Sequence, residues 1–246
     1  MTNIVILNSQ DHRSLRVQGE AASALGDNKR FVQIAVTEFS HLIVQCPILL
    51  SKDADTGAFY CGAMLGFDEG ENLFLREGKG HDGYRPLNLQ RMPFYAAGDV
   101  LAIDLDHPRV SSERGERLFA DSGEPTRYLQ AISASFRELK PGLEMTKVFI
   151  ATLLKLKLVE PIDINVSFDD GSKRNIVGLY TIDQGALEAL PDDTVINLFR
   201  RGYLRLIDAL IASLKQVPVL AQKKNARLLQ ASLRGQEFLP QRPQSH

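Results

Sequence analysis

The sequence has no tryptophan and only two cysteines, Cys46 and Cys61, among its 246 residues. The two cysteines do not form a CxxC pair, so we expect neither a disulfide framework nor a thiolate zinc site. No apolar run reaches the roughly 18 residues that a membrane span requires, because two lysines interrupt the longest candidate, Val148 to Val159. A positively charged leader is missing from the first residues, MTNIVILNSQDHR. We therefore expect a cytoplasmic protein without a transmembrane segment.

Charge of one sign is not in excess either, since 29 basic residues stand against 30 acidic ones. Such a balance gives no overall attraction to nucleic acid, so we expect no nucleic-acid partner. The sequence contains no P-loop, no GxSxG elbow and no HExxH motif. A GxGxxG match at residues 78–83 is followed by Pro86 instead of the long helix that a dinucleotide site needs. We expect no cofactor, and the motifs leave open whether the protein is an enzyme.

Strand patterns dominate the first half of the chain. We expect strands at residues 3–7, 15–17, 47–50, 59–67, 94–96 and 100–105, with residues 72–75 returning from 59–67 as a hairpin. Apolar residues at helical spacing from Ile34 to Cys46 predict a helix that stops at Pro47. A single helical turn is expected between Pro86 and Met92.

Helical periodicity dominates the second half. A helix is predicted to start at Pro125 and to be broken by Pro141-Gly142, and a second, buried helix is predicted for residues 145–158. Strict alternation between residues 162 and 168, followed by Asp170-Gly171, predicts a hairpin that returns through residues 176–182. Helices are expected again from Asp183 until Pro218 ends the pattern.

These patterns predict an α+β fold in which a mixed, largely antiparallel sheet and a central hairpin pack with several helices of the second half. The simplest organisation is one domain over residues 1–218, followed by a basic helix and a disordered tail over residues 219–246. A boundary near residues 120–125, where the periodicity changes, is the alternative. The C-terminal helix either folds back on the core or docks on another chain.

Acidic residues at the end of the predicted strand 100–105 form the candidate catalytic or metal-binding site. Asp104 and Asp106 point to one face of a strand, and His107 joins them if the strand bends at its end, so that the three could bind a divalent metal. His12 is a further candidate beside the two carboxylates for a metal-assisted reaction. In the alternative interpretation, the strand end is solvated and Arg109 pairs with Asp104, Asp106 or a nearby glutamate.

Several short motifs together resemble one bacterial family. They are Glu38-Phe39, Cys46-Pro47-Ile48, Gly70 to Phe74, Gly83-Tyr84-Arg85-Pro86, Asp104 to Arg109, Gly123 to Thr126, Leu158 to Ile162, Gly178-Leu179-Tyr180 and Arg200-Arg201-Gly202. In this order they resemble the SapC family, over residues 10 to 216. The resemblance implies shared architecture, a bacterial origin and an association with surface-layer proteins. It carries over no catalytic residues.

Three functions stay open at this point. We favour an accessory or binding protein that assists the modification, assembly or export of a surface protein or peptide, and that recognises its partner by hydrogen bonds. The candidate binding residues are Tyr84, Arg85, Arg109 and Tyr128. A metal-assisted enzyme that uses Asp104 is the rival. A homodimeric structural protein, joined through residues 203–216 or the tail, is the third possibility.

Overall fold

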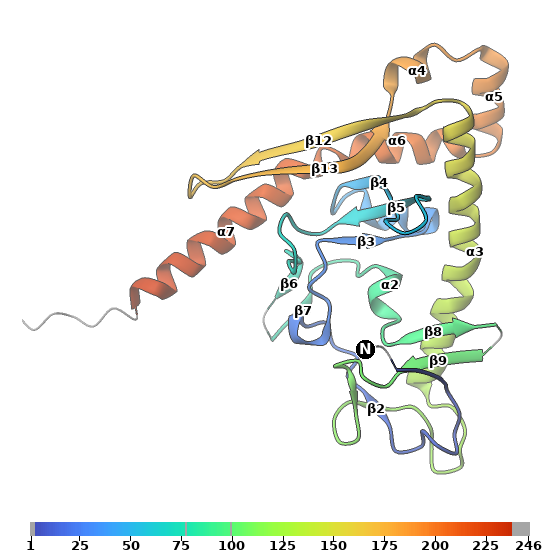
Figure 1. Ribbon diagram of the computed structural model, residues 1–246, viewed down its shortest axis with the longest axis vertical. Coiled ribbons are helices and arrows are strands. Elements are labelled where there is room, and N and C mark those ends of the chain that lie inside the picture. Colours follow the sequence, from blue (N-terminus) through green and yellow to red (C-terminus); the bar gives the residue numbers. More distant parts are fainter. Residues whose placement is uncertain (1–2, 77, 99, 238–246) are drawn as a thin grey trace, which may run out of the picture.

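The computed structural model describes residues 3–76, 78–98 and 100–237, and it confirms the expected α+β class (Figure 1). The largest sheet is antiparallel and has the strand order β12-β13-β4-β5-β3. Its strands are β3 (Phe31–Gln33), β4 (Ile48–Lys52), β5 (Phe59–Met64), β12 (Val159–Ser167) and β13 (Lys173–Ile182). The hairpin predicted around Asp170-Gly171 is confirmed as β12 and β13.

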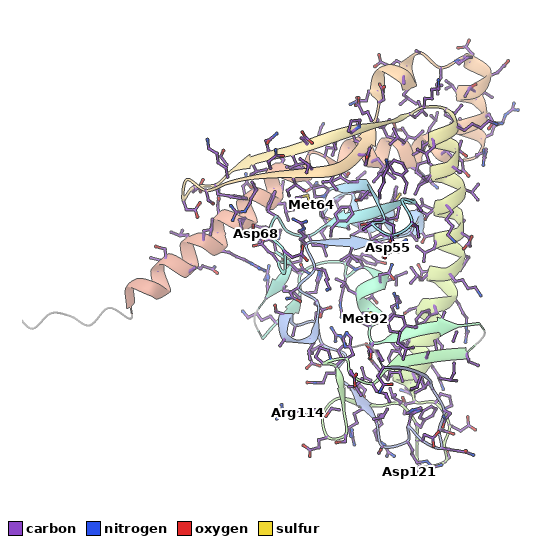
Figure 2. The ribbon with its side chains drawn as sticks, viewed as in Figure 1. Asp55, Met64, Asp68, Met92, Arg114 and Asp121 are labelled. Carbon is purple, nitrogen blue, oxygen red and sulfur yellow. The ribbon has the colours of Figure 1, made fainter. Side chains whose placement is uncertain are left out.

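Smaller sheets form from the remaining strands of the first half. One has the order β1-β9-β8, another β10-β2-β11, and a third pairs β6 with β7. Their bounds are β1 (Ile4–Ile6), β2 (Arg16–Val17), β6 (Leu75–Arg76), β7 (Gly80–His81), β8 (Phe94–Ala97), β9 (Val100–Asp104), β10 (Val110–Ser111) and β11 (Glu116–Arg117). Figure 2 shows Arg114 and Asp121 on loops at the end of the molecule opposite the β12–β13 hairpin.

The helices differ greatly in length. Short turns are η1 (Ser23–Leu25), η2 (Val36–Glu38), α1 (Phe39–Leu42), α2 (Leu87–Gln90) and α4 (Gln184–Glu188). Longer helices are α3 (Arg127–Lys155), α5 (Asp192–Arg200), α6 (Tyr203–Ser213) and α7 (Gln216–Glu237). Within the described ranges, no helix has the length and apolar character to cross a membrane.

The continuity of α3 corrects the predicted break at Pro141. One helix of 29 residues runs through this proline, which is exposed on its outer side. An interior proline costs about 3 kcal/mol, because it removes one backbone hydrogen bond and crowds the preceding turn. Tertiary contacts offset this cost: Thr146 Oγ1 accepts a hydrogen bond of 2.9 Å from the amide of Val36. The helix begins at Arg127 after the N-cap Thr126, two residues later than predicted.

The sequence suggested that the second half of α3 is buried on all sides, but in the structure it is buried on one side only. Phe149 and Leu153 lie in the core, whereas Met145, Val148 and Leu154 are exposed. Figure 1 shows the reason, because α3 flanks the sheets along one side of the molecule instead of passing between layers. A helix in this position buries one stripe of side chains.

Two other predicted elements differ from the structure. The chain does turn back after residue 67, and the amide of Leu73 donates to the carbonyl of Leu65 at 2.7 Å, but residues 72–75 form no strand ladder with β5, which ends at Met64, and β6 pairs with β7 instead. The long helix expected from Ile34 to Cys46 is reduced to η2 and the four-residue α1. The first residues of the expected helix directly follow β3, in which Val32 and its neighbours pair with β5. Local helical spacing was outweighed by strand pairing with a distant segment.

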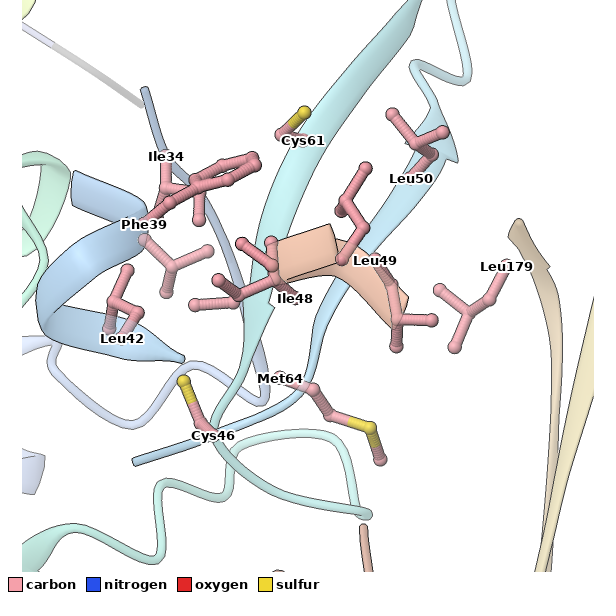
Figure 3. Close-up of a cluster of buried hydrophobic side chains, with 14 of the residues drawn as sticks. Ile34, Phe39, Leu42, Cys46, Ile48, Leu49, Leu50, Cys61, Met64 and Leu179 are labelled. Carbon is pink, nitrogen blue, oxygen red and sulfur yellow. The ribbon is translucent and has the colours of Figure 1, made fainter. Parts of the chain in front are cut away.

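The apolar core of the described residues has three separate parts, and α3 contributes side chains to each. The larger cluster surrounds β4 and β5 and includes the residues of Figure 3, such as Phe39, Ile48 and Leu50. Ile207 and Leu210 of α6 lie in it, so the apolar face of α6 is covered within the chain. A second cluster joins β8, β9 and the start of α3, and a third, of three residues, joins Leu139 in the middle of α3 to Ala35 and Leu87. A helix that serves all three clusters gains stability from remaining continuous.

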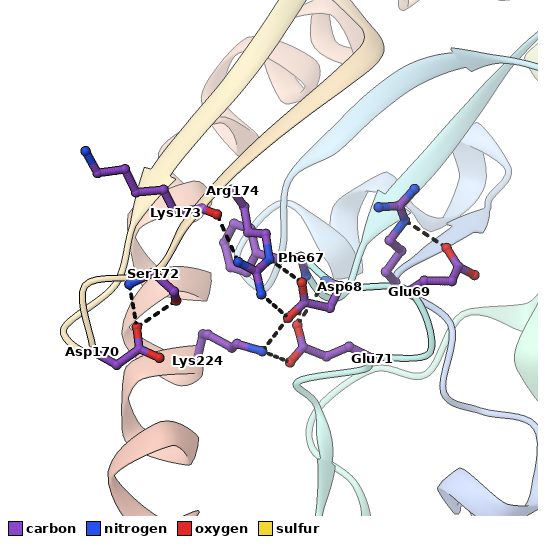
Figure 4. Close-up of polar contacts among 10 residues, drawn as sticks. Phe67, Asp68, Glu69, Glu71, Asp170, Ser172, Lys173, Arg174 and Lys224 are labelled. Atoms are coloured by element: carbon purple, nitrogen blue, oxygen red, sulfur yellow. Dashed lines mark hydrogen bonds and ion pairs between the residues drawn. The ribbon is translucent and has the colours of Figure 1, made fainter.

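The C-terminal helix α7 contacts its own chain. Lys224 forms ion pairs of 2.7 Å with Asp68 and 2.6 Å with Glu71, in the loop after β5 (Figure 4). Arg174 of β13 reaches the same Asp68 at 2.5 Å, and Leu220 is buried in the larger cluster. The helical run that we expected Pro218 to end stops earlier, at Ser213 of α6, and Pro218 lies in the first turn of α7, where a proline is tolerated. The tail that we expected to be disordered lies outside the described residues from 238 onward.

Substitution of Gly142 tests the packing that keeps α3 continuous. A Cβ at this position would lie 2.8 Å from Thr37 Oγ1 and 2.9 Å from the buried Ala35 Cβ. Alanine favours a helix by about 1 kcal/mol over glycine, but we expect crowding to dominate and Gly142→Ala to lower the free energy of unfolding by about 1–3 kcal/mol. Urea denaturation measures the change.

The exposed Ala134 of the same helix supplies the control for this prediction. Ala134→Gly exchanges the same two residue types without a packing partner, so it should lower the free energy of unfolding by about 1 kcal/mol through helix propensity alone. If Gly142→Ala instead raised the stability by as much as Ala134→Gly lowers it, α3 would not depend on the contact with Thr37 and Ala35.

Candidate functional site

The acidic strand end binds its own backbone. Asp104, the last residue of β9, is 4 % exposed, and its Oδ1 accepts hydrogen bonds from the amides of Asn3 at 2.9 Å and Asp106 at 3.2 Å. The Asp106 side chain is exposed. His107 Nδ1 accepts from the amide of Arg109 at 3.2 Å, and burial is the main cause that lowers the His107 pKa. Asp104 and His107 thus both cap a turn.

His12 lies in a different turn. It is 8 % exposed, and its Nδ1 accepts a hydrogen bond of 3.1 Å from the amide of Asn8. In the part of the chain that the structure describes, no three His, Cys, Asp or Glu side chains are grouped so that they could hold a metal ion. Asp104, His107 and His12 therefore each accept local backbone hydrogen bonds, and His12 belongs to a different turn from the other two.

Arg85 and Arg109 converge, but on an acid that sequence reasoning did not select. Asp27 Oδ1 accepts from Arg85 Nη2 at 2.7 Å, and Asp27 Oδ2 pairs with Arg109 Nη2. Arg109 Nη1 also donates to the carbonyls of Gln18 at 2.6 Å and Glu20 at 2.7 Å. The alternative in which Arg109 pairs with Asp104 or Asp106 is therefore wrong. Asp27 and Arg109 are each 1 % exposed, so the cluster is internal.

Tyr128 lies near this cluster, whereas Tyr84 packs apart from it, with its ring stacked on that of His41. Tyr128 contacts Gly19, where a Cβ would come within 3.2 Å of its ring, and burial raises the Tyr128 pKa. Tyr84 donates a hydrogen bond of 3.2 Å to Oε1 of Glu38, a fully buried carboxylate. Burial is the main cause that raises the Glu38 pKa, although the amides of Ala35 and Leu87 also donate to it.

A cleft of about 310 Å³ opens elsewhere, between α3, α2, β8 and the edge of the large sheet. Aromatic and polar side chains line it. They are Gln33 of β3, Phe59 and Tyr60 of β5, Asn88 and Arg91 of the α2 region, Tyr95 of β8, and Phe136, Lys140, Glu144 and Lys147 of α3. Figure 2 labels Met92, which directly follows Arg91 where α2 passes into β8. The cleft has the mixed apolar and polar lining that is typical of ligand sites.

Arg91 is the half-buried cation of this cleft. Its Nε donates to Asn88 Oδ1 and its Nη1 to the carbonyl of Phe94, both at 2.7 Å. Burial lowers the Arg91 pKa, although an arginine stays charged at neutral pH. No carboxylate among the described residues pairs with it, whereas Arg85 and Arg109 both meet Asp27. Arg91 therefore presents a charge that the described residues leave without a counter-ion.

Sequence reasoning did not identify the cleft, because its lining comes from segments far apart along the chain. Residues 33, 60, 91 and 140 meet only after the sheet and α3 pack together. The one local signal is the sequence LNLQRMPFY, in which a single-turn helix and a strand place Arg91 close to Tyr95. Arg91 lies 5.2 Å from the Tyr95 ring centroid. Nothing in the sequence marks this arginine as lacking an acidic partner.

The fold and the cleft define an α+β protein with a candidate ligand-binding site along its longest helix. The SapC family model matches residues 7–220, so the chain belongs to the SapC family. This match confirms the resemblance inferred from the short motifs, and it includes every residue that lines the cleft. Neither a curated protein nor a solved structure matches the chain.

Removal of Arg109 tests the structural role of the internal cluster. Arg109→Leu leaves Asp27 buried with Arg85 alone, so we expect the free energy of unfolding to fall by about 3–5 kcal/mol. Arg117→Leu is the matched control, because its ion pair with Asp121 lies on the surface and is worth less than about 1 kcal/mol. Thermal and urea denaturation compare the two variants. Equal losses would show that the Asp27 cluster contributes no more than a surface pair.

Proposed function

We propose that this SapC protein is an accessory binding protein, which holds a segment of a bacterial surface protein or peptide during its modification, assembly or export. The cleft carries the proposal: it combines aromatic walls, hydrogen-bonding groups and an arginine without a carboxylate partner among the described residues. A volume of about 310 Å³ suits a few side chains or the end of a chain, near the lower limit of ligand pockets.

The cellular location belongs to the same proposal. We place the protein in the cytoplasm, where a partner is available before export. Cys46 and Cys61 are both free and buried, in keeping with a reducing compartment. Burial raises the pKa of the Cys46 thiol to about 12, so this cysteine is unreactive at neutral pH.

Capture from the native host tests the proposal. We expect a recurrent, near-stoichiometric partner to co-purify with the tagged protein at native expression, and its recovery to fall at least tenfold with Arg91→Ala combined with Tyr95→Ala. The exposed Arg200→Ala on α5 is the matched charge control and should retain the partner. Cross-linking followed by mass spectrometry locates the contact. A partner that the cleft variant captures as well as wild type, or the lack of any recurrent partner, would refute the proposal.

A further inference from the structure

The charges of the cleft lining are unequal. The cations are Arg91, Lys140 and Lys147, and the one lining carboxylate is Glu144. Glu144 already pairs with Lys147 at 2.7 Å across one turn of α3, and both side chains are mostly exposed. Arg91 and Lys140 have no ion-pair partner among the described residues. The cleft is therefore positive, although the chain as a whole has a formal net charge of −1.

The Arg91 guanidinium is held in a defined orientation. Two of its nitrogens, Nε and Nη1, are engaged by Asn88 and by the Phe94 carbonyl. Nη2 donates to no acceptor among the described residues. A guanidinium oriented in this way binds an incoming anion with little further loss of side-chain freedom.

Aromatic rings flank this charge. The Arg91 guanidinium carbon lies 5.2 Å from the ring centroid of Tyr95 and 5.8 Å from that of Phe136. An anion bound to Arg91 within the cleft would bring its neighbouring group close to these rings. Apolar or aromatic groups lose the least hydration in such contacts. The walls thus select what the anion is attached to, while Arg91 selects the anion.

From this geometry we infer that the cleft binds a carboxylate attached to an apolar or aromatic group, with Arg91 as the anchoring cation and Lys140 as a supporting charge at the rim. The planar carboxylate matches the planar guanidinium. A phosphate dianion would lose more hydration between the aromatic walls. The carboxylate comes either from the C-terminus of a peptide or from a small aromatic acid. This inference rests on the proposed function in one respect, because both assign ligand binding to this cleft.

Calorimetric titration with matched probes tests the carboxylate. The peptide acetyl-Gly-Ala-Phe with a free C-terminus is compared with the same peptide as its C-terminal amide, and phenylacetate with phenylacetamide. We expect each acid to bind at least tenfold more tightly than its amide, and inorganic phosphate to bind more weakly than either acid. Tighter binding of the peptide acid identifies a chain end as the ligand, and tighter binding of phenylacetate identifies a small acid. Equal binding of acids and amides, or preferred binding of phosphate, would overturn the inference.

Variants assign the recognition to Arg91. Arg91→Gln should weaken acid binding at least tenfold and leave amide binding unchanged, whereas Arg200→Gln should change neither. Circular dichroism shows whether Arg91→Gln is folded. Lys140→Gln provides a second readout that does not depend on a buried site, because Lys140 is exposed on α3, and it should weaken acid binding two- to threefold. Acid binding that is unchanged in both cleft variants would overturn the assignment.

The outcomes separate this inference from the proposed function. Acid binding that depends on Arg91, without a cleft-dependent protein partner in the host, would support the carboxylate site and refute the accessory role. A cleft-dependent partner, with no preference of the cleft for acids over amides, would support the accessory role and refute the carboxylate site.

Discussion

The carboxylate of Asp27 is the interaction on which the arrangement of the first half depends. It lies in the protein interior, where a charge is tolerated only if it is paired and hydrogen-bonded. Arg85, Arg109 and the amide of Ala22 satisfy it, and they come from three separate segments. The backbone carbonyl of the same residue accepts from Asn72 at 2.9 Å. These segments must therefore meet at one point, because each would otherwise leave a buried polar group without a partner.

This internal constraint also positions the candidate site. Arg85 precedes α2, and the buried Glu38 accepts a hydrogen bond from Leu87 at the beginning of α2. Arg91 follows directly after that helix, so its guanidinium reaches the cleft only because α2 is held at both of these points. Burial of a carboxylate costs free energy, which is why the Glu38 pKa is raised. The cost is offset by three hydrogen bonds, which set the orientation of the cleft wall.

The sequence predicted elements well wherever a local pattern agreed with the tertiary environment. The alternation of residues 162–168 gave the β12–β13 hairpin, and the turn near Pro86 gave α2. The predictions were wrong where distant packing outweighed a local preference, as at Pro141 within α3 and in the short α1. The cleft at Arg91 was not predicted from the sequence. Arg109, which was expected to bind a partner, lies in the protein interior. That Arg109 is buried against Asp27, and that Arg91 lines a cleft without a carboxylate partner among the described residues, depends on residues from far along the chain.

By itself the sequence determined the α+β class, the SapC resemblance and the approximate positions of most strands, because these depend on local periodicity and on short motifs. Tertiary structure alone decided that α3 is one helix, that α7 contacts the loop after β5, and that Arg109 pairs with Asp27. It also decided that Arg91 faces a cleft. The physical reason is that burial and ion pairing are determined by which distant segments meet, and local propensity contains no information about such contacts.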